Sequence, residues 1–172
     1  ALSIAAKPAA EADRLGRPGW RNATLDIDAH EGGGRAQLAL NKGALIFPGL
    51  FEPDEVKTLS DEVPALYARR EAFNVREKDS DAVRTNFAAH LYSEPFARLA
   101  RHPRMVLPVQ QLFDDEPLYM HQFKINGKMA FEGDVWQWHQ DYGTWKNDDL
   151  MPTERAMNVA IFLDDVNAYN GP

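Results

Sequence analysis

Apolar residues recur at helical spacing in two stretches of the chain. The first stretch begins after Glu52, with a proline in the first turn and acidic residues at the end where the helix dipole is positive. Its apolar positions predict that one face packs against a core. These positions are Val56, Leu59, Val63, Leu66 and Tyr67. The second stretch covers roughly residues 95–113. Internal prolines disfavour a continuous helix, so we expect Pro64 to weaken or kink the first helix and Pro103 and Pro108 to split the second.

Strand patterns precede and follow these helices. Residues 44–47 form a short apolar run before Pro48 and Gly49, which is typical of a buried strand. Residues 118–126 alternate, which predicts a strand with two different faces. One face would carry Met120, Gln122, Lys124 and Asn126, and the other His121, Phe123 and Ile125.

Two more strands are predicted at residues 136–142 and 157–163, with a polar loop at 146–153 between them. Helices first and strands afterwards predict an α+β fold whose second half is a β sandwich. Residues 1–40 are rich in Ala, Gly and charge, and they predict an irregular N-terminal extension with room for one short helix.

The composition is that of an ordinary globular chain. Of the 172 residues, 44 % are apolar, and 19 Lys and Arg against 26 Asp and Glu give a formal net charge of −7. An acidic chain without a basic stripe argues against nucleic acid or an anionic membrane as partner. No apolar run is long enough to span a membrane, and no signal peptide is visible. The absence of cysteine excludes disulfides and thiolate metal sites, and it suits a cytoplasmic protein.

One short motif carries most of the chemistry. His139 and Asp141 lie two residues apart in an aromatic stretch, and on a strand such residues point to the same face. One imidazole and one carboxylate side by side are two thirds of the facial triad that binds Fe(II) in non-heme oxygenases. A hydrogen-bonded surface pair is the alternative that the spacing alone leaves open.

The sequence around this motif resembles one enzyme family. Residues 43–51 and 96–103 are similar to its early strand and helix and to a later helix, and the most specific match is residues 120–145 with 170–172, including the motifs HQFKIN, GDVW and WHQDY. The family is the phytanoyl-CoA dioxygenase superfamily of Fe(II)- and 2-oxoglutarate-dependent oxygenases, and the pattern is most similar to its proline trans-4-hydroxylase and ectoine hydroxylase branch. The resemblance implies a double-stranded β-helix, a jelly-roll or cupin-like core, preceded by N-terminal helices.

The resemblance also implies roles for eight residues. Those expected to bind iron are His139 and Asp141, those beside the cosubstrate 2-oxoglutarate are Gln122, Asn126 and Trp136, and those lining the substrate pocket are Lys124, Tyr142 and Trp145. Lys124 stands where the ectoine enzymes have Arg. Because Lys lacks the planar fork of Arg, a different substrate geometry is expected.

Two further family residues, a second His on iron and an Arg that binds 2-oxoglutarate, are expected beyond Pro172. Residues 41–172 are therefore expected to be the N-terminal part of a single oxygenase domain, truncated at the C-terminus. The implied reaction uses O2 and hydroxylates a C–H bond of a small free substrate, an amino acid or related zwitterion. A carboxylate at Asp141 favours hydroxylation, because related halogenases have a small residue there.

Alternatives remain at this stage. The substrate could be bound to a carrier or resemble a lipid, or the domain could be a β-sandwich binding module that holds no iron. Arg84 could contact a polar substrate or be a solvated surface residue. We expect His121 to be a packed or surface residue and not a ligand, because the alternation places it on the face opposite Gln122.

Overall fold

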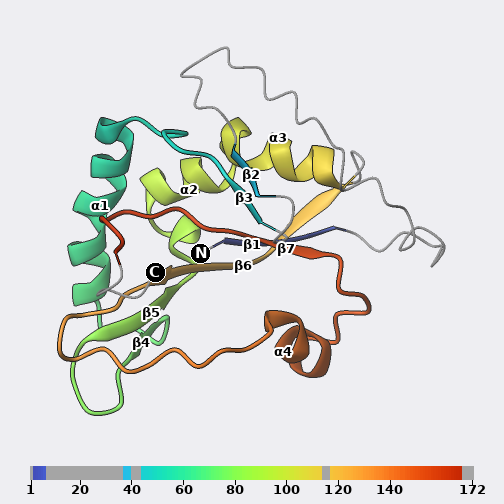
Figure 1. Cartoon of the computed structure of the whole chain (residues 1–172). Coiled ribbons are helices and arrows are strands. Elements are labelled where there is room, and N and C mark those ends of the chain that lie inside the picture. The colour runs from blue at the N-terminus through green and yellow to red at the C-terminus, as the bar shows by residue number, and fades with distance from the viewer. Residues whose placement is uncertain (1, 7–36, 40–43, 114–116, 168–172) are drawn as a thin grey trace.

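A computed structural model describes residues 2–6, 37–39, 44–113 and 117–167. Its helices and strands follow one another as shown in Figure 1. They are β1 (Leu2–Ala6), β2 (Gln37–Ala39), β3 (Ala44–Ile46), α1 (Pro53–Ala68), β4 (Asn74–Arg76), β5 (Val83–Phe87), a 3₁₀ turn (Ala89–Leu91), α2 (Glu94–Ala100), α3 (Pro103–Leu112), β6 (Leu118–Asn126), α4 (Asp141–Asp148) and β7 (Ala156–Val159).

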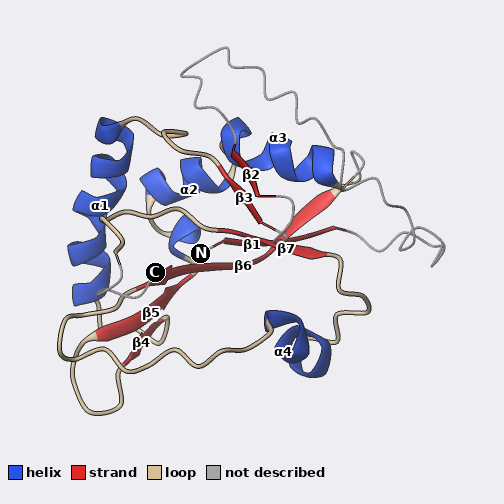
Figure 2. Cartoon of the chain, viewed as in Figure 1, coloured by secondary structure: helices blue, strands red, loops and turns tan. Residues whose placement is uncertain are grey.

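Five strands form an antiparallel sheet in the order β4-β5-β6-β1-β7, and β2 pairs separately with β3. Helices α1, α2 and α3 lie on one side of this sheet and α4 lies on the other (Figure 2). Helices packed on an antiparallel sheet agree with the expected α+β class.

The core lies between the sheet and helices α1 to α3. Its buried residues come from the periodic positions of the helices and from one face of β6, as the apolar pattern predicts. They are Leu59, Leu66, Ala89, Phe96, Leu99, Met105, Val109, Phe113, Phe123 and Ile125.

Helix α1 begins where its sequence predicts. Glu52 is the N-cap, Pro53 follows it, and the Glu55 carboxylate accepts a 2.8 Å hydrogen bond from the Glu52 N–H in a capping box. Glu55 also pairs with Arg104 of α3, and that hydrogen bond is the largest cause that lowers the pKa of Glu55. Pro64 lies inside the helix and does not end it, because buried residues on both sides, Leu59 among them, hold the helix against the core.

The prolines of the second helical stretch have different effects. Pro103 separates α2 from α3, as expected, and sits in the first turn of α3, where its missing N–H costs nothing. The predicted break at Pro108 is wrong, because α3 continues to Leu112. Met105 and Val109, both 2 % exposed, anchor α3 on each side of Pro108.

The hairpin of β4 and β5 was not predicted, because its strands are short and lie in or beside a polar stretch. A buried polar chain joins it to the C-terminal end of α1. The Asn86 amide donates to Asn74 Oδ1 over 2.6 Å, and the Asn74 amide donates to the carbonyls of Leu66 and Arg69 over 2.7 and 2.9 Å. Helix ends leave carbonyl groups without partners, so these bonds cap α1 with side chains from the hairpin.

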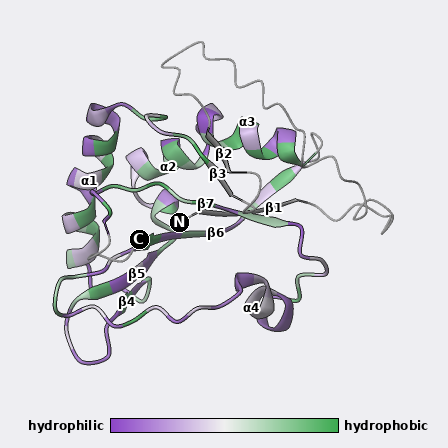
Figure 3. Cartoon of the chain, in the orientation of Figure 1, coloured by the Kyte–Doolittle hydropathy of each residue, from purple (hydrophilic) through white to green (hydrophobic). Residues whose placement is uncertain are grey.

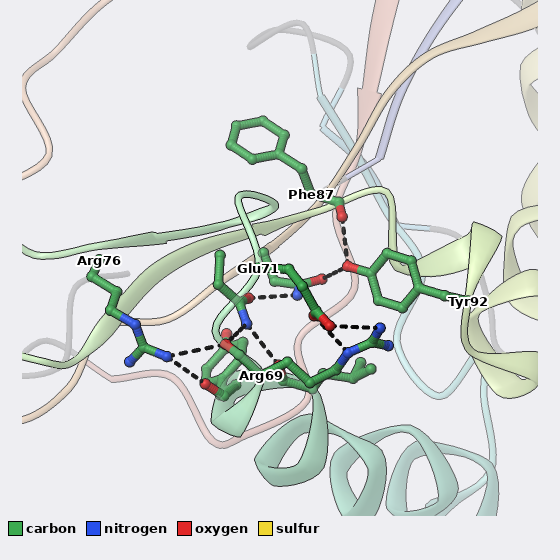
Figure 4. Close-up of polar contacts among 9 residues, drawn as sticks. Arg69, Glu71, Arg76, Phe87 and Tyr92 are labelled. Carbon is green, nitrogen blue, oxygen red and sulfur yellow. Dashed lines mark hydrogen bonds and ion pairs between the residues drawn. The ribbon is translucent and has the colours of Figure 1, made fainter.

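Tyr92 completes this polar chain from the other side (Figure 4). Its hydroxyl lies 2.8 Å from Asn86 Oδ1 and 2.6 Å from the Phe87 carbonyl oxygen, and shares one proton between the two acceptors. Its ring stacks on Phe73 at 4.4 Å between centroids. Asn86 is fully buried, so every bond lost here would leave a polar group without water.

The N-terminal extension contains one element of the main sheet. The irregular structure expected for residues 1–40 is wrong for β1, which pairs antiparallel with both β6 and β7, and for β2. Pairing of this kind depends on distant strands and leaves no periodic signal in so short a segment. Residues 7–36 lie outside the described residues.

Strand β6 contains a bulge at His121. On β1, Ser3 lies opposite Gln122 and Ile4 lies opposite Met120, so His121 has no partner there. An extra residue of this kind shifts the alternation of side chains by one position.

The bulge changes the predicted faces of β6. Leu118 and Met120 pack against the same core as Phe123 and Ile125. The expected assignment of Met120 to the face of Gln122 is therefore wrong. His121 is on that face instead, where its ring contacts Trp145 of α4.

Among the described residues, no helix is both long and apolar enough to cross a membrane.

Replacing Tyr92 by Phe tests the buried polar chain. Loss of the hydroxyl leaves acceptors on Asn86 and Phe87 without their donor, so Tyr92→Phe should lower the free energy of unfolding by about 1–2 kcal/mol. Urea unfolding followed by circular dichroism measures this. Tyr119→Phe is the matched control, because Tyr119 is 46 % exposed. Equal stability of the two variants would contradict the role given to Tyr92.

Candidate functional site

The segment that carries the His139-x-Asp141 motif is not a strand. The strand predicted over residues 136–142 is wrong: residues 134–140 belong to no helix or strand, and α4 begins at Asp141. The aromatic residues favour a strand, but no neighbouring strand in the described part of the chain pairs with this segment. The C-terminal end of α4 also replaces the first residues, 146–148, of the loop predicted at residues 146–153. Helix α4 is hydrophilic over most of its length (Figure 3).

The structure nevertheless brings the two motif residues together. His139 Nε2 lies 3.2 Å from Asp141 Oδ1, and the side chains are 56 % and 28 % exposed. His139 Nδ1 lies 2.6 Å from the Gln137 carbonyl oxygen, which can only accept, so Nδ1 carries a proton. In neutral His139 the lone pair of Nε2 therefore faces a carboxylate oxygen. A proton or a metal cation between these atoms would turn their repulsion into attraction.

The second oxygen of Asp141 is held by β7. Asn158 Nδ2 donates to Asp141 Oδ2 over 2.6 Å, so the two oxygens of the carboxylate have different partners. Asn158 was not among the site residues predicted from the sequence. Its signal was a polar residue at one position of an otherwise apolar strand.

These distances fit two ligands of one metal ion. Two ligand atoms about 2.1 Å from an ion and at right angles to each other are about 3.0 Å apart, close to the separation of Nε2 and Oδ1. In the part of the chain that the structure describes, no group of three His, Cys, Asp or Glu side chains could hold a metal. A third ligand would have to come from other residues.

Three predicted residues share the face of β6 that is opposite the core. They are Gln122, Lys124 and Asn126, which alternate with the buried Phe123 and Ile125. Thr85 Oγ1 donates to Asn126 Oδ1 over 3.2 Å and fixes the orientation of that amide. The Oε1 atom of Gln122 is buried without a hydrogen-bond partner among the described residues, which marks a place where a ligand or water could bind.

An open cleft of about 1090 Å³ gathers half of the predicted site. Its walls come from α1, β6 and residues 136–139 and 159–166. Of the predicted residues, Lys124, Asn126, Trp136 and His139 line it. Burial is the main cause that raises the pKa of Tyr67 in the same wall to about 12, so this phenol stays neutral at physiological pH.

The two other predicted substrate residues pack elsewhere. Trp145 is 4 % exposed and forms a small apolar cluster with Met151, Tyr142 and Ala156. The Trp145 ring contacts the His121 ring edge-on at 5.3 Å, and His121 Nε2 lies 3.0 Å from Asp149 Oδ2. These contacts attach α4 to β6 and thereby hold the helix that begins with Asp141.

Comparison with known proteins gives a consistent family. A family model described as phytanoyl-CoA dioxygenase matches residues 40–172. An L-proline trans-4-hydroxylase of Streptomyces griseoviridis is 39 % identical over 130 residues, which cover 76 % of this chain and 48 % of that protein. Ectoine dioxygenases of Bordetella bronchiseptica and Halomonas elongata are 38 % and 36 % identical, again over 76 % of this chain and over 43 % and 40 % of their own length. The chain thus spans about half the length of the curated relatives it matches.

Replacing Asn158 by Ala tests whether it holds Asp141 in place. Groups that orient a metal ligand typically contribute a factor of about 10 to 100 in metal affinity. We expect Asn158→Ala to weaken binding of Co(II), a spectroscopic substitute for Fe(II), about tenfold in an absorption titration. Asn147→Ala, at an exposed position of α4, should bind Co(II) like the wild type. Unchanged affinity in Asn158→Ala would contradict this role.

Proposed function

The chain belongs to the phytanoyl-CoA dioxygenase family, and from that premise we propose that the protein is an Fe(II)- and 2-oxoglutarate-dependent dioxygenase. It hydroxylates a C–H bond of a small free substrate, an amino acid or related zwitterion. The observation that carries this proposal is the convergence of His139 Nε2 and Asp141 Oδ1 at 3.2 Å beside a cleft.

His139 and Asp141 would hold the iron as two of its three protein ligands. Asn158 leaves Oδ1 of Asp141 to the metal by binding Oδ2, and the Gln137 carbonyl holds the imidazole with Nε2 toward the metal position. A second His, from outside the described residues, completes the proposed triad. When bound, iron supplies the oxidising chemistry together with 2-oxoglutarate and O2.

Gln122, Asn126 and Trp136 are the proposed residues for 2-oxoglutarate. Asn126 is held in orientation by Thr85, and its amide nitrogen can donate to a carboxylate. The oxygen and nitrogen of an amide exchange by a half-turn. The buried position of Gln122 Oε1 can therefore hold a donor instead, and a carboxylate would satisfy it. Trp136 lines the same cleft as Asn126.

Lys124, Tyr142 and Trp145 are the proposed substrate residues. Lys124 lines the cleft, and an ammonium group can attract the carboxylate of an amino acid. The names of the relatives specify two small substrates, proline and ectoine, which supports a substrate of similar size here. For Tyr142 and Trp145 the proposed role rests on the family resemblance, because both pack in the cluster on α4.

The proposal extends to the fold. The five-stranded antiparallel sheet would supply strands of a double-stranded β-helix, of which residues 41–172 would form the N-terminal part. The alternative of a non-catalytic binding module is favoured by one observation, the absence of three metal-binding side chains in one group among the described residues. Metal binding distinguishes the two functions.

Removing either proposed ligand tests the metal site. Asp141→Ala and His139→Ala should each weaken Fe(II) binding by more than about a hundredfold, because loss of a ligand costs more than loss of its supporting contact. Anaerobic titration of Fe(II) in the presence of 2-oxoglutarate, followed by visible absorption, measures this. Asp148→Ala, an exposed position of α4, is the control. Wild-type turnover in Asp141→Ala would exclude Asp141 as a ligand.

Two further variants separate the cosubstrate from the substrate. Asn126→Ala removes a donor to 2-oxoglutarate, so the KM for 2-oxoglutarate should rise about tenfold while the KM for the substrate changes little. Lys124→Met removes the charge proposed to bind the substrate and should do the opposite. Succinate release at varied concentrations of each compound gives both constants. An Asn126→Ala variant with an unchanged KM for 2-oxoglutarate would contradict the assignment.

A further inference from the structure

The segment of residues 134–140 needs external support, because it has no secondary structure of its own. It carries both Trp136 and His139. Its exposed side chains give it little packing: Trp138 is 103 % and Val135 is 63 % exposed. Whatever holds this backbone therefore determines where the imidazole of His139 and the ring of Trp136 lie.

Arg84 of β5 makes three contacts with this segment, two hydrogen bonds and one cation–π contact. Its guanidinium donates to the Val135 carbonyl over 3.2 Å and to the Asp134 carbonyl over 3.5 Å. The same group lies over the Trp136 ring, 4.0 Å from the centroid, in a cation–π contact. One rigid planar group thus fixes two backbone carbonyls and an aromatic ring.

Glu77 holds Arg84 in this arrangement. Its carboxylate lies 3.2 Å from Arg84 Nη1, and it also accepts a 3.2 Å hydrogen bond from the Asp134 N–H. The Glu77 side chain is 6 % exposed and the Arg84 side chain 23 %, so water screens this pair only in part. Loss of one partner would leave the other charge largely buried.

We propose that Arg84, oriented by Glu77, is a positioning residue that sets the place of Trp136 and, through the same backbone, of His139. We name Arg84 and Glu77 the clamp. This inference rests on the proposed function, because it assigns the clamp an effect on cosubstrate and metal binding. It also replaces the two interpretations of Arg84 made from the sequence, a contact to a polar substrate and a solvated surface residue, because the guanidinium binds groups of the protein itself.

The chemistry of the side chains makes the clamp specific for arginine. A guanidinium can stack on a ring and donate in its own plane at the same time, whereas an ammonium group is a point charge without a plane. Arg84→Lys should therefore keep the pairing with Glu77 and lose the combined grip on Asp134, Val135 and Trp136. Small displacements of reacting groups can cost about a hundredfold in rate, so a loosened segment has measurable consequences.

The test compares Arg84→Gln, Arg84→Lys and Glu77→Gln with the wild type and with a control. Arg98→Gln is the control, because Arg98 lies on α2 in an ion pair whose side chains are 75 % and 65 % exposed. Two quantities are measured in the protein: amide hydrogen exchange of residues 134–140, without metal, and the dissociation constants of Fe(II) and 2-oxoglutarate. Exchange of core amides in α1 and β6 shows that each variant is folded.

The clamp predicts a graded result. Arg84→Gln should speed exchange in residues 134–140 and weaken 2-oxoglutarate binding, each about tenfold, with core exchange unchanged. Arg84→Lys and Glu77→Gln should show intermediate effects, and Arg98→Gln none. Wild-type exchange and wild-type binding in Arg84→Gln would overturn the clamp and leave the proposed function standing. A wild-type protein that binds neither Fe(II) nor 2-oxoglutarate would instead overturn the proposed function and, with it, the effect assigned to the clamp.

Discussion

The two faces of β6 are the constraint on which the rest of this structure depends. One face must bury Phe123 and Ile125 against helices α1 to α3, and the other presents Gln122, Lys124 and Asn126. Strong apolar burial on the first face fixes the register, so the polar face is fixed as a consequence. The burial of apolar side chains that stabilises the core thus also fixes the positions of the site residues on β6.

The bulge at His121 lets β6 pack its apolar side chains on the core and also contact α4. It keeps Leu118 and Met120 on the core face before the shift, and it turns His121 toward Trp145 and Asp149 after it. That contact holds α4 near β6. Helix α4 begins with Asp141. The packing of His121 on β6 therefore affects the position of the proposed metal ligand through this one helix.

Much of the architecture could be predicted from local pattern, and the exceptions have two causes. The α1 start at Glu52, the separation of α2 from α3 at Pro103 and strand β6 all follow from caps, prolines and periodicity. The hairpin of β4 and β5 was missed because its strands are short and lie in or beside a polar stretch. The place of β1 in the sheet depends on β6 and β7, which lie far along the chain, so no short window contains it. The pairing of His139 with Asp141 was expected from strand alternation. The structure achieves it differently, with an extended segment that meets the first turn of a helix.

The residues that hold the site in place could not be predicted from local sequence pattern either. Asn158 lies on β7 and Glu77 directly follows β4, and each has a role only because the chain brings it beside the segment of residues 134–141.

The most direct test of the proposed metal site is anaerobic titration of the wild-type protein with Fe(II) and then 2-oxoglutarate, followed by free amino acids in the presence of O2. A site that holds iron and 2-oxoglutarate should give a weak visible charge-transfer band and succinate release that an amino acid stimulates. A folded protein that shows neither would contradict the proposed metal site.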